Sequence, residues 1–251
     1  MIRLIVNADD YGRTTGINEG TIEAHLRGIV TSTTVMILGS AAEEGIRLAL
    51  RRAPRLSLGL HCVFTGGGTP ASDPEQLKTL APGGRFARNA EALPEAIDPD
   101  EVRRELLAQI ARFESIAGRP PSHLDSHHHS ALHPSIQPVF AAVAAERRLP
   151  VRASSPAAAA VLRGAGLRVP DRFVDGLYAE GATVENLLRV ISDLPEGTAE
   201  LMCHPGFPDA ELLAGSTYAR ERAGEVEALC DPSVRDLLAE RRVELANFRA
   251  L

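Results

Sequence analysis

The sequence predicts one α/β domain, folded as a closed or nearly closed (β/α) barrel with parallel strands. Short apolar runs alternate with amphipathic segments along nearly all of the 251 residues, which is typical of parallel strands joined by helices. Seven or eight strand candidates are present, enough for a closed or nearly closed barrel. No Gly-x-Gly-x-x-Gly follows the first strand, which argues against an open doubly wound sheet. No change of composition divides residues 1–251.

Local patterns of apolar and branched residues define the elements. The run Leu4–Val6 is typical of a strand buried on both faces, and residues 30–38 are rich in β-branched residues. Gly28 ends a helix that covers residues 15–27. Strands are predicted at 4–6, 30–38, 56–64, the start of 123–133, 151–153, 173–177, 199–203 and 243–248, and helices at 15–27, 41–52, 99–117, 135–148, 157–162, 184–194, 217–229 and 233–242.

The bulk composition restricts the class of protein and its partners. A net charge of −6 argues against nucleic acid as the main partner, because phosphate binding needs a basic face. Three cysteines give no disulfide framework and favour a reducing, cytoplasmic location. No apolar run is long enough for a signal peptide or a membrane span. The absence of tryptophan excludes a sugar cleft built on tryptophan platforms.

The histidine-rich stretch His123–His133 is the strongest sign of chemistry. It holds five of the eight histidines of the chain, together with Asp125. Imidazole and carboxylate are ligands that zinc and similar ions prefer. If the stretch starts as a strand, its side chains alternate, so that Asp125, His127 and His129 point to the same face. The alternative is a polar surface loop that happens to be rich in histidine.

Polar side chains follow three other predicted strands in the same way. Asp9 and Asp10 follow the first strand, His61 lies near the end of another, and His204 directly follows residues 199–203. The carboxyl ends of parallel strands gather on one face of a barrel. A turn or helix N-cap would explain one aspartate, and a core histidine would explain His61. Two adjacent acids exceed what a cap needs.

Together these groups predict metal-assisted hydrolysis. Two histidines and one carboxylate can hold a divalent ion and leave positions open for water and substrate. A second carboxylate would take the proton of the water, and a histidine would protonate the leaving group. The residues alone do not decide between His127 and His129 as a ligand. They also leave open zinc, which histidine favours, and magnesium.

Residues 65–99 form the least regular part of the sequence. Glycine and proline recur through this segment, and the triple glycine Gly66–Gly68 lacks the Gly-Lys-Ser/Thr of a phosphate-binding loop. We expect an irregular insertion over the site that acts as a lid, a substrate wall or a subunit contact.

Five motifs in a fixed order add a family resemblance. They are Asn-Ala-Asp-Asp-Tyr-Gly at 7–12, Val-Thr-Ser-Thr-Thr at 30–34, His61, His-Leu-Asp-Ser-His-His-His at 123–129 and Met-Cys-His-Pro-Gly at 202–206. In these motifs the chain resembles the YdjC-type carbohydrate deacetylases, which include the chitooligosaccharide deacetylases. The resemblance runs from the first strand to the last helix. It implies a distorted or incomplete (β/α) TIM-like barrel with parallel strands and the hydrolysis of N-acetyl groups from amino sugars.

Carried over by position, the resemblance implies a complete set of site residues. Asp10, His61 and His127 would bind one divalent ion, Mg²⁺ or Zn²⁺, while Asp9 acts as general base and His204 as general acid. A homodimer is a family-level expectation. The chain departs from the family at residues 130–131, where Ser-Ala replaces the usual Val-His and His133 follows two places later. A supporting or substrate contact would be lost or moved there.

Four further residues are candidates for binding or supporting the substrate: Tyr11, Asp125, His129 and Arg152. Tyr11 could stack on a sugar ring. Arg152 ends a short predicted strand, where it would orient Asp9 or meet the substrate, and a surface arginine is the alternative of equal weight. Two other functions remain open. One is a metal-dependent sugar isomerase or epimerase, and the other is a non-catalytic metal- or sugar-binding protein.

Overall fold

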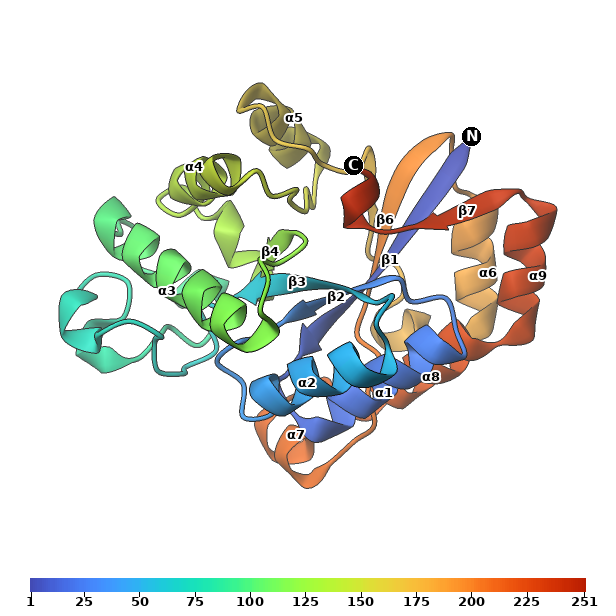
Figure 1. Ribbon diagram of the computed structural model, residues 1–251, viewed down its shortest axis with the longest axis horizontal. Helices are drawn as coiled ribbons and strands as arrows, with labels where there is room; N and C mark the ends of the chain where they lie inside the picture. Colours follow the sequence, from blue (N-terminus) through green and yellow to red (C-terminus); the bar gives the residue numbers. More distant parts are fainter.

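A seven-stranded parallel sheet forms the centre of the protein (Figure 1). The computed structural model describes residues 1–251. The strands lie in the order β4-β3-β2-β1-β6-β5, and β7 pairs with the first half of β1. Because β4 and β5 are the two ends of this order, the curled sheet is an incomplete barrel, as predicted. The strands are β1 (Ile2–Tyr11), β2 (Ser32–Val35), β3 (Ser57–Cys62), β4 (Leu124–Ser126), β5 (Arg172–Val174), β6 (Gly197–Cys203) and β7 (Val243–Ala246).

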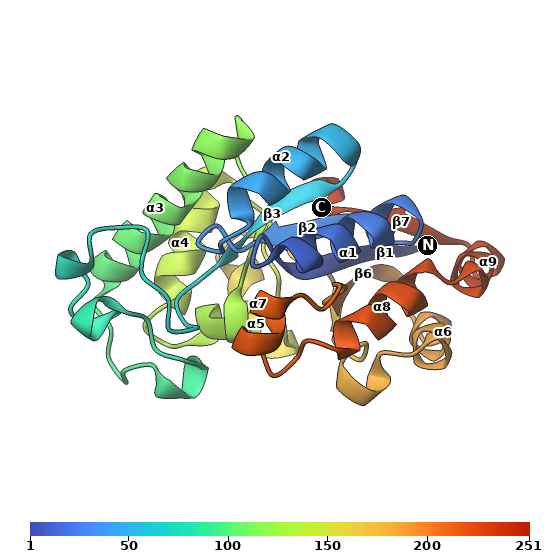
Figure 2. The ribbon, with the colours of Figure 1, turned by 90° about the horizontal axis from the view of Figure 1, so that it is seen from below.

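Helices surround the sheet. Figure 2 shows α1 and α2 side by side along it, α3 and α4 at one end, and α6, α8 and α9 at the other. Asp98 caps the amino end of α3 with its side chain, and Gly118 ends the helix in a left-handed conformation. The helices are α1 (Thr15–Leu26), α2 (Ala42–Arg52), α3 (Pro99–Ala117), α4 (Gln137–Arg147), α5 (Pro156–Gly164), α6 (Val184–Ser192), α7 (Ala210–Gly215), α8 (Glu221–Cys230) and α9 (Pro232–Glu240).

Several element boundaries differ from the sequence-based expectations. The first strand extends to Tyr11 and therefore includes both aspartates, which were expected to follow it. Residues 151–153 form no strand, because Val151 makes only an isolated bridge to Leu124. Residues 217–220 precede α8 rather than starting it, and α7 was not predicted. One continuous hydrophobic core of 59 buried residues packs the helices against the sheet.

The insertion at residues 65–99 is folded against α3. Its only regular pieces are the short 3₁₀ turns η1 (Pro74–Gln76), η2 (Pro82–Gly84) and η3 (Ala90–Ala92). On α3, Glu105 accepts hydrogen bonds from the backbone N–H groups of Ala71 and Ser72, each at 2.9 Å. Glu101 accepts 2.8 Å bonds from the backbone of Thr79 and Leu80 in the same way. These bonds hold the insertion against α3.

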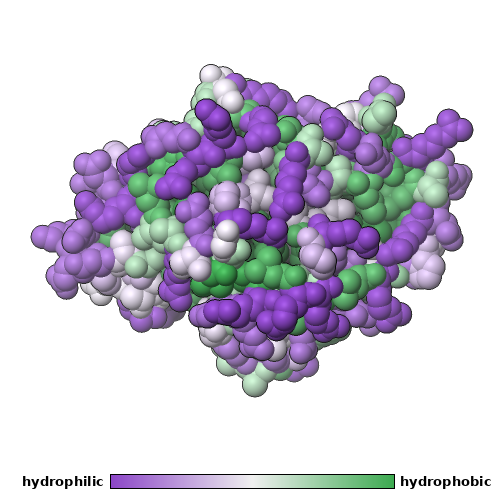
Figure 3. All heavy atoms as spheres, viewed as in Figure 1, coloured by the Kyte–Doolittle hydropathy of each residue, from purple (hydrophilic) through white to green (hydrophobic).

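Polar and charged side chains cover most of the face drawn in Figure 3, and hydrophobic residues are visible between them. No helix is both long and apolar enough to cross a membrane.

Candidate active site

A bulge in β1 turns both adjacent aspartates toward the same site. In a regular strand, neighbouring side chains point to opposite faces. Here the β1–β2 register shifts between Ala8 and Tyr11, and Asp10 has a left-handed φ of 66°. Such a bulge re-aims a side chain, and aspartate tolerates this conformation better than most residues. Asp9 and Asp10 are both buried, at 2% and 3% exposure.

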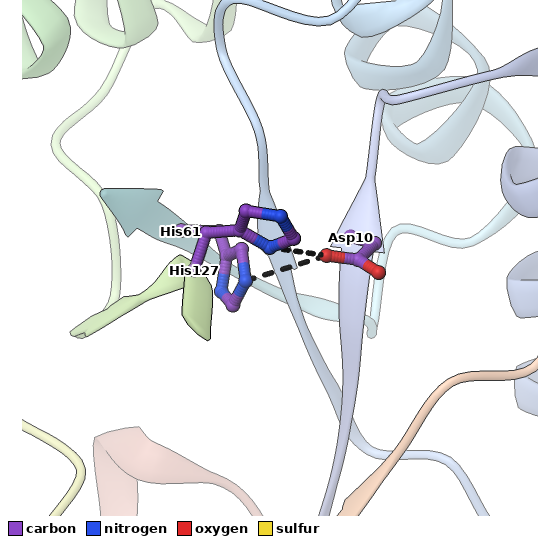
Figure 4. A group of neighbouring side chains, drawn as sticks. All are labelled: Asp10, His61 and His127. Atoms are coloured by element: carbon purple, nitrogen blue, oxygen red, sulfur yellow. Dashed lines mark ion pairs between the residues drawn. The ribbon is translucent and has the colours of Figure 1, made fainter. Parts of the chain in front are cut away.

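Asp10, His61 and His127 form a compact cluster of possible metal ligands. Oδ1 of Asp10 lies 3.4 Å from Nε2 of His61 and 3.1 Å from Nδ1 of His127 (Figure 4). The three candidate ligand atoms all lie within 4.8 Å of one another, and all three residues are buried. One carboxylate and two imidazoles fit a zinc-type site that keeps further positions open. The donor set therefore fits the predicted divalent ion.

Asp125 lies behind this cluster and orients His61. Oδ1 of Asp125 is 2.7 Å from Nδ1 of His61, and Oδ2 accepts a 2.9 Å bond from the Thr34 hydroxyl. Burial by itself lowers the pKa of His61, but Asp125 and Asp10 outweigh it and raise the pKa to about 10. A carboxylate on the second nitrogen fixes the ring of a metal-binding histidine. Asp125 therefore fixes the orientation of the His61 ring.

Arg152 is buried and donates two hydrogen bonds to Asp9. Its guanidinium donates to Oδ2 and Oδ1 of Asp9 at 2.6 and 2.7 Å, and also to Glu200 at 2.7 Å. Burial alone would raise the pKa of Asp9, but the Arg152 charge outweighs it and holds the pKa well below its usual range. Asn7 donates a further 2.9 Å bond to Oδ1. Asp9 is thus held ionised and oriented, and the surface-arginine alternative is wrong.

His204 faces the same cavity from the residue after β6. Its backbone N–H donates to Glu225, while Nδ1 of its ring has no hydrogen-bond partner. Burial lowers the pKa of His204 to about 4, although the charge of Asp9 opposes that shift. The ring is therefore neutral at neutral pH, and it must gain a proton before it can donate one.

A cavity of about 310 Å³ joins these groups. Tyr178, which is 46% exposed, lines it and stacks on Tyr218 with the ring centroids 4.2 Å apart. No residue of the 65–99 insertion lines this cavity, but Ala90 and Glu91 of the insertion line an adjoining one together with His128 and His129. The lining residues are Asp9, Asp10, Arg13, His61, Ser126, His127, His128, His129, Asp175, Tyr178, Met202, His204, Ser216, Thr217, Tyr218 and Arg222.

The histidine stretch does not alternate as expected. Strand β4 ends at Ser126, and residues 127–132 form the 3₁₀ segment η4 (His127–Leu132), with left-handed φ values at His128 and His129. Consequently His127 reaches the ligand cluster, while His129 only lines the cavity and packs edge-on against Phe173. His133 lies outside this cavity.

Tyr11 also lies elsewhere than expected. It is fully buried, and its hydroxyl donates a 2.7 Å bond to the backbone oxygen of Gly45. Because β1 ends with this ring packed toward α2, Tyr11 cannot stack on a ligand in the cavity.

Reasoning from the sequence gave no site role to a second set of buried polar residues around the site. Arg222 and Glu225 come from α8, while Asn7, Thr34 and Glu200 come from strands of the sheet. The strand residues occupy positions in apolar or β-branched runs, where a polar side chain is a signal of pairing. The two helical residues gave no such signal, because charged residues on a helix usually face solvent.

Comparisons with known proteins match the whole chain. The model for the family described as YdjC-like protein matches residues 3–240. A carbohydrate deacetylase of Geobacillus stearothermophilus is 41% identical over 98% of this chain and 96% of its own length. A chitooligosaccharide deacetylase of Serratia marcescens is 38% identical over 99% of this chain and 98% of its own. The crystal structure of a protein from Enterococcus faecalis, 33% identical, covers 99% of this chain and 98% of its own with a TM-score of 0.93.

Proposed function

This chain belongs to the YdjC-like family, and on that premise we propose that it removes N-acetyl groups from amino sugars with one divalent metal ion. The observation that carries the proposal is the buried Asp10–His61–His127 cluster beside an ionised second carboxylate, Asp9, in an open cavity. A structural metal site is closed and needs no spare carboxylate. A hydrolytic site needs an open coordination position for water and substrate, and a second carboxylate to accept the proton of the water.

Asp10, His61 and His127 would hold the ion. When bound, the ion would lower the pKa of water and polarise the acetyl carbonyl. Two histidine ligands favour zinc, although magnesium with several retained waters is the other candidate.

The protein itself would supply the proton transfers. Asp9 is ionised and held by Arg152 and Asn7, so it can accept the proton of the attacking water. His204 would donate a proton to the departing amine after first taking one up, because burial lowers the pKa of its ring to about 4 and outweighs the opposing charge of Asp9. The products would be acetate and a free amino sugar.

The cavity suits a small sugar at the reacting end. Its volume of about 310 Å³ lies at the lower end of the range for ligand sites. The exposed ring of Tyr178 could pack on a sugar face there. We therefore propose an N-acetylated monosaccharide or short chitooligosaccharide as the substrate.

Acetate release tests the proposal. The protein is stripped with a chelator, reloaded with Zn²⁺, Co²⁺ or Mg²⁺, and incubated with N-acetylglucosamine or diacetylchitobiose. We expect acetate only from the reloaded protein. An isomerised sugar without acetate would instead support an isomerase, and metal binding without any turnover would support a non-catalytic protein.

Asp9→Asn tests the assignment of the base. We expect the variant to bind the metal but to lose about 10²- to 10⁴-fold in kcat, because proton transfer by a positioned side chain contributes that much. Asp236→Asn, the same change at an exposed position of α9, is the matched control. Full activity of Asp9→Asn would contradict the assignment.

A further inference from the structure

Helix α8 places two buried charged residues next to the site. Arg222 and Glu225 are separated by three positions, so they lie on the same face of the helix. Their exposed fractions are 2% and 0%. Arginine and glutamate are rarely buried to this extent unless they are paired, and apolar residues of similar volume would often serve stability as well. A role at the site explains their presence better than packing does.

Arg222 binds Oδ2 of Asp10, the carboxylate oxygen that does not face His61 and His127. Its guanidinium donates to Oδ2 of Asp10 at 2.5 Å, while Oδ1 faces His61 and His127. The same guanidinium is anchored by a 3.0 Å bond to the backbone oxygen of Tyr218, so its orientation is fixed. Because Oδ2 is occupied in this way, Asp10 offers only Oδ1 to a metal ion held together with His61 and His127.

Glu225 holds the backbone of His204. Its Oε2 accepts a 2.5 Å bond from the His204 N–H, and Oε1 accepts a bond from the Tyr218 hydroxyl. Oε1 also lies 3.9 Å from Nδ1 of His204, the ring nitrogen that has no hydrogen-bond partner. Glu225 thus places a carboxylate close to that nitrogen.

We propose that α8 is a positioning element for both halves of the reaction. Arg222 restricts the metal ligand Asp10 to one oxygen, and Glu225 fixes the position of the proton donor His204. The inference rests on the proposed function for the roles of Asp10 and His204. It makes two separate predictions, because each residue of α8 contacts a different reactive group.

Metal affinity without substrate tests the Arg222 half. Zn²⁺ is titrated calorimetrically into the chelator-treated wild type and into Arg222→Lys, which keeps the charge but loses the planar fork. We expect affinity to fall about 10- to 100-fold, as for other groups that orient metal ligands. Because a buried lysine can prevent folding, Arg222→Gln is measured alongside it, and circular dichroism checks the fold of both variants.

Steady-state kinetics test the Glu225 half. Glu225→Gln has nearly the same shape but loses the carboxylate charge. We expect kcat to fall about tenfold or more, since a mispositioned proton donor loses part of its contribution, with KM and Zn²⁺ affinity unchanged. The exposed α8 residue Glu227, changed to Gln, and the exposed Arg220, changed to Lys, are matched controls.

The outcomes separate this inference from the proposed function. If the wild type binds neither Zn²⁺ nor Mg²⁺, the proposed function fails. If the wild type binds Zn²⁺ and folded Arg222 variants bind it as tightly or more tightly, Arg222 does not position Asp10. If Glu225→Gln keeps the wild-type kcat, or loses metal affinity together with kcat, the separate role of Glu225 is overturned.

Discussion

Replacing Arg152 should damage stability and activity together. The Arg152→Gln change removes one guanidinium from three buried carboxylates, whose oxygens lie 2.6–3.0 Å from its nitrogens. Breaking a buried ion pair on one side costs about 3–5 kcal/mol, because the remaining charge is left uncompensated. For a chain of this size, that loss corresponds to a fall of roughly 6–20 °C in Tm.

The pH dependence of this loss has a definite sign. Arg152 holds the pKa of Asp9 below its usual range, so its stabilisation is present above the ordinary aspartate pKa and is lost as the pH falls. The stability deficit of Arg152→Gln should therefore be largest near neutral pH and shrink toward acid. Without the guanidinium, burial raises the pKa of Asp9, and the acid limb of kcat/KM should move to higher pH.

Thermal unfolding across pH, combined with a pH–rate profile, measures both effects. Arg103→Gln is the matched control, because the Arg103–Glu146 pair at 2.8 Å is about half exposed and such pairs contribute about 1 kcal/mol or less. A Tm change in Arg152→Gln no larger than that in Arg103→Gln, with an unmoved acid limb, would refute the reasoning.

Three further predictions concern other parts of the molecule. Because the pKa of His61 is raised to about 10, Zn²⁺ must displace a proton from this histidine when it binds at neutral pH. The affinity for Zn²⁺ should therefore rise with pH. Equal binding heats in buffers of different ionisation enthalpy would show that no proton is released and would contradict this prediction. Tyr11→Phe should lower stability by about 1 kcal/mol and leave kcat unchanged, and a large loss of kcat would return Tyr11 to the site. Glu105→Gln should destabilise the insertion by about 1–3 kcal/mol and speed its proteolysis, which gel electrophoresis would follow.

The fold was predictable because its signals are local. Apolar runs, branched residues and helix ends indicate where strands and helices lie, and alternation of the two indicates a parallel sheet. The exception at residues 151–153 is informative. Val151 makes only one bridge to Leu124, because β4 is the last strand at that end of the sheet. The sequence does not show which strand candidate lies beyond the edge of a sheet.

The site was predictable where chemistry follows a strand directly. Asp9, Asp10, His61 and His204 lie at strand ends and line one cavity. Prediction failed where the backbone conformation decides which way a side chain points. The left-handed φ values of His128 and His129 end the alternation of side chains between two faces, and a run of histidines carries no signal for this conformation. Arg222 and Glu225 could not be found either, because their partners are distant in sequence and only tertiary packing brings them together.

The central place of β1 has a consequence for how the chain folds during synthesis. Ile2 pairs with Gly197 in β6 and with Val243 in β7, so β1 is synthesised long before these two strands that pair with it. Contacts of such long sequence separation make folding slow, and an apolar strand that lacks its neighbours is open to wrong pairing. Early β1–β2–β3 pairing, through shorter connections, can protect only the half of one β1 edge that starts at Asn7. The first half of β1 pairs with β6 and with β7, and it becomes protected only once those strands have been made.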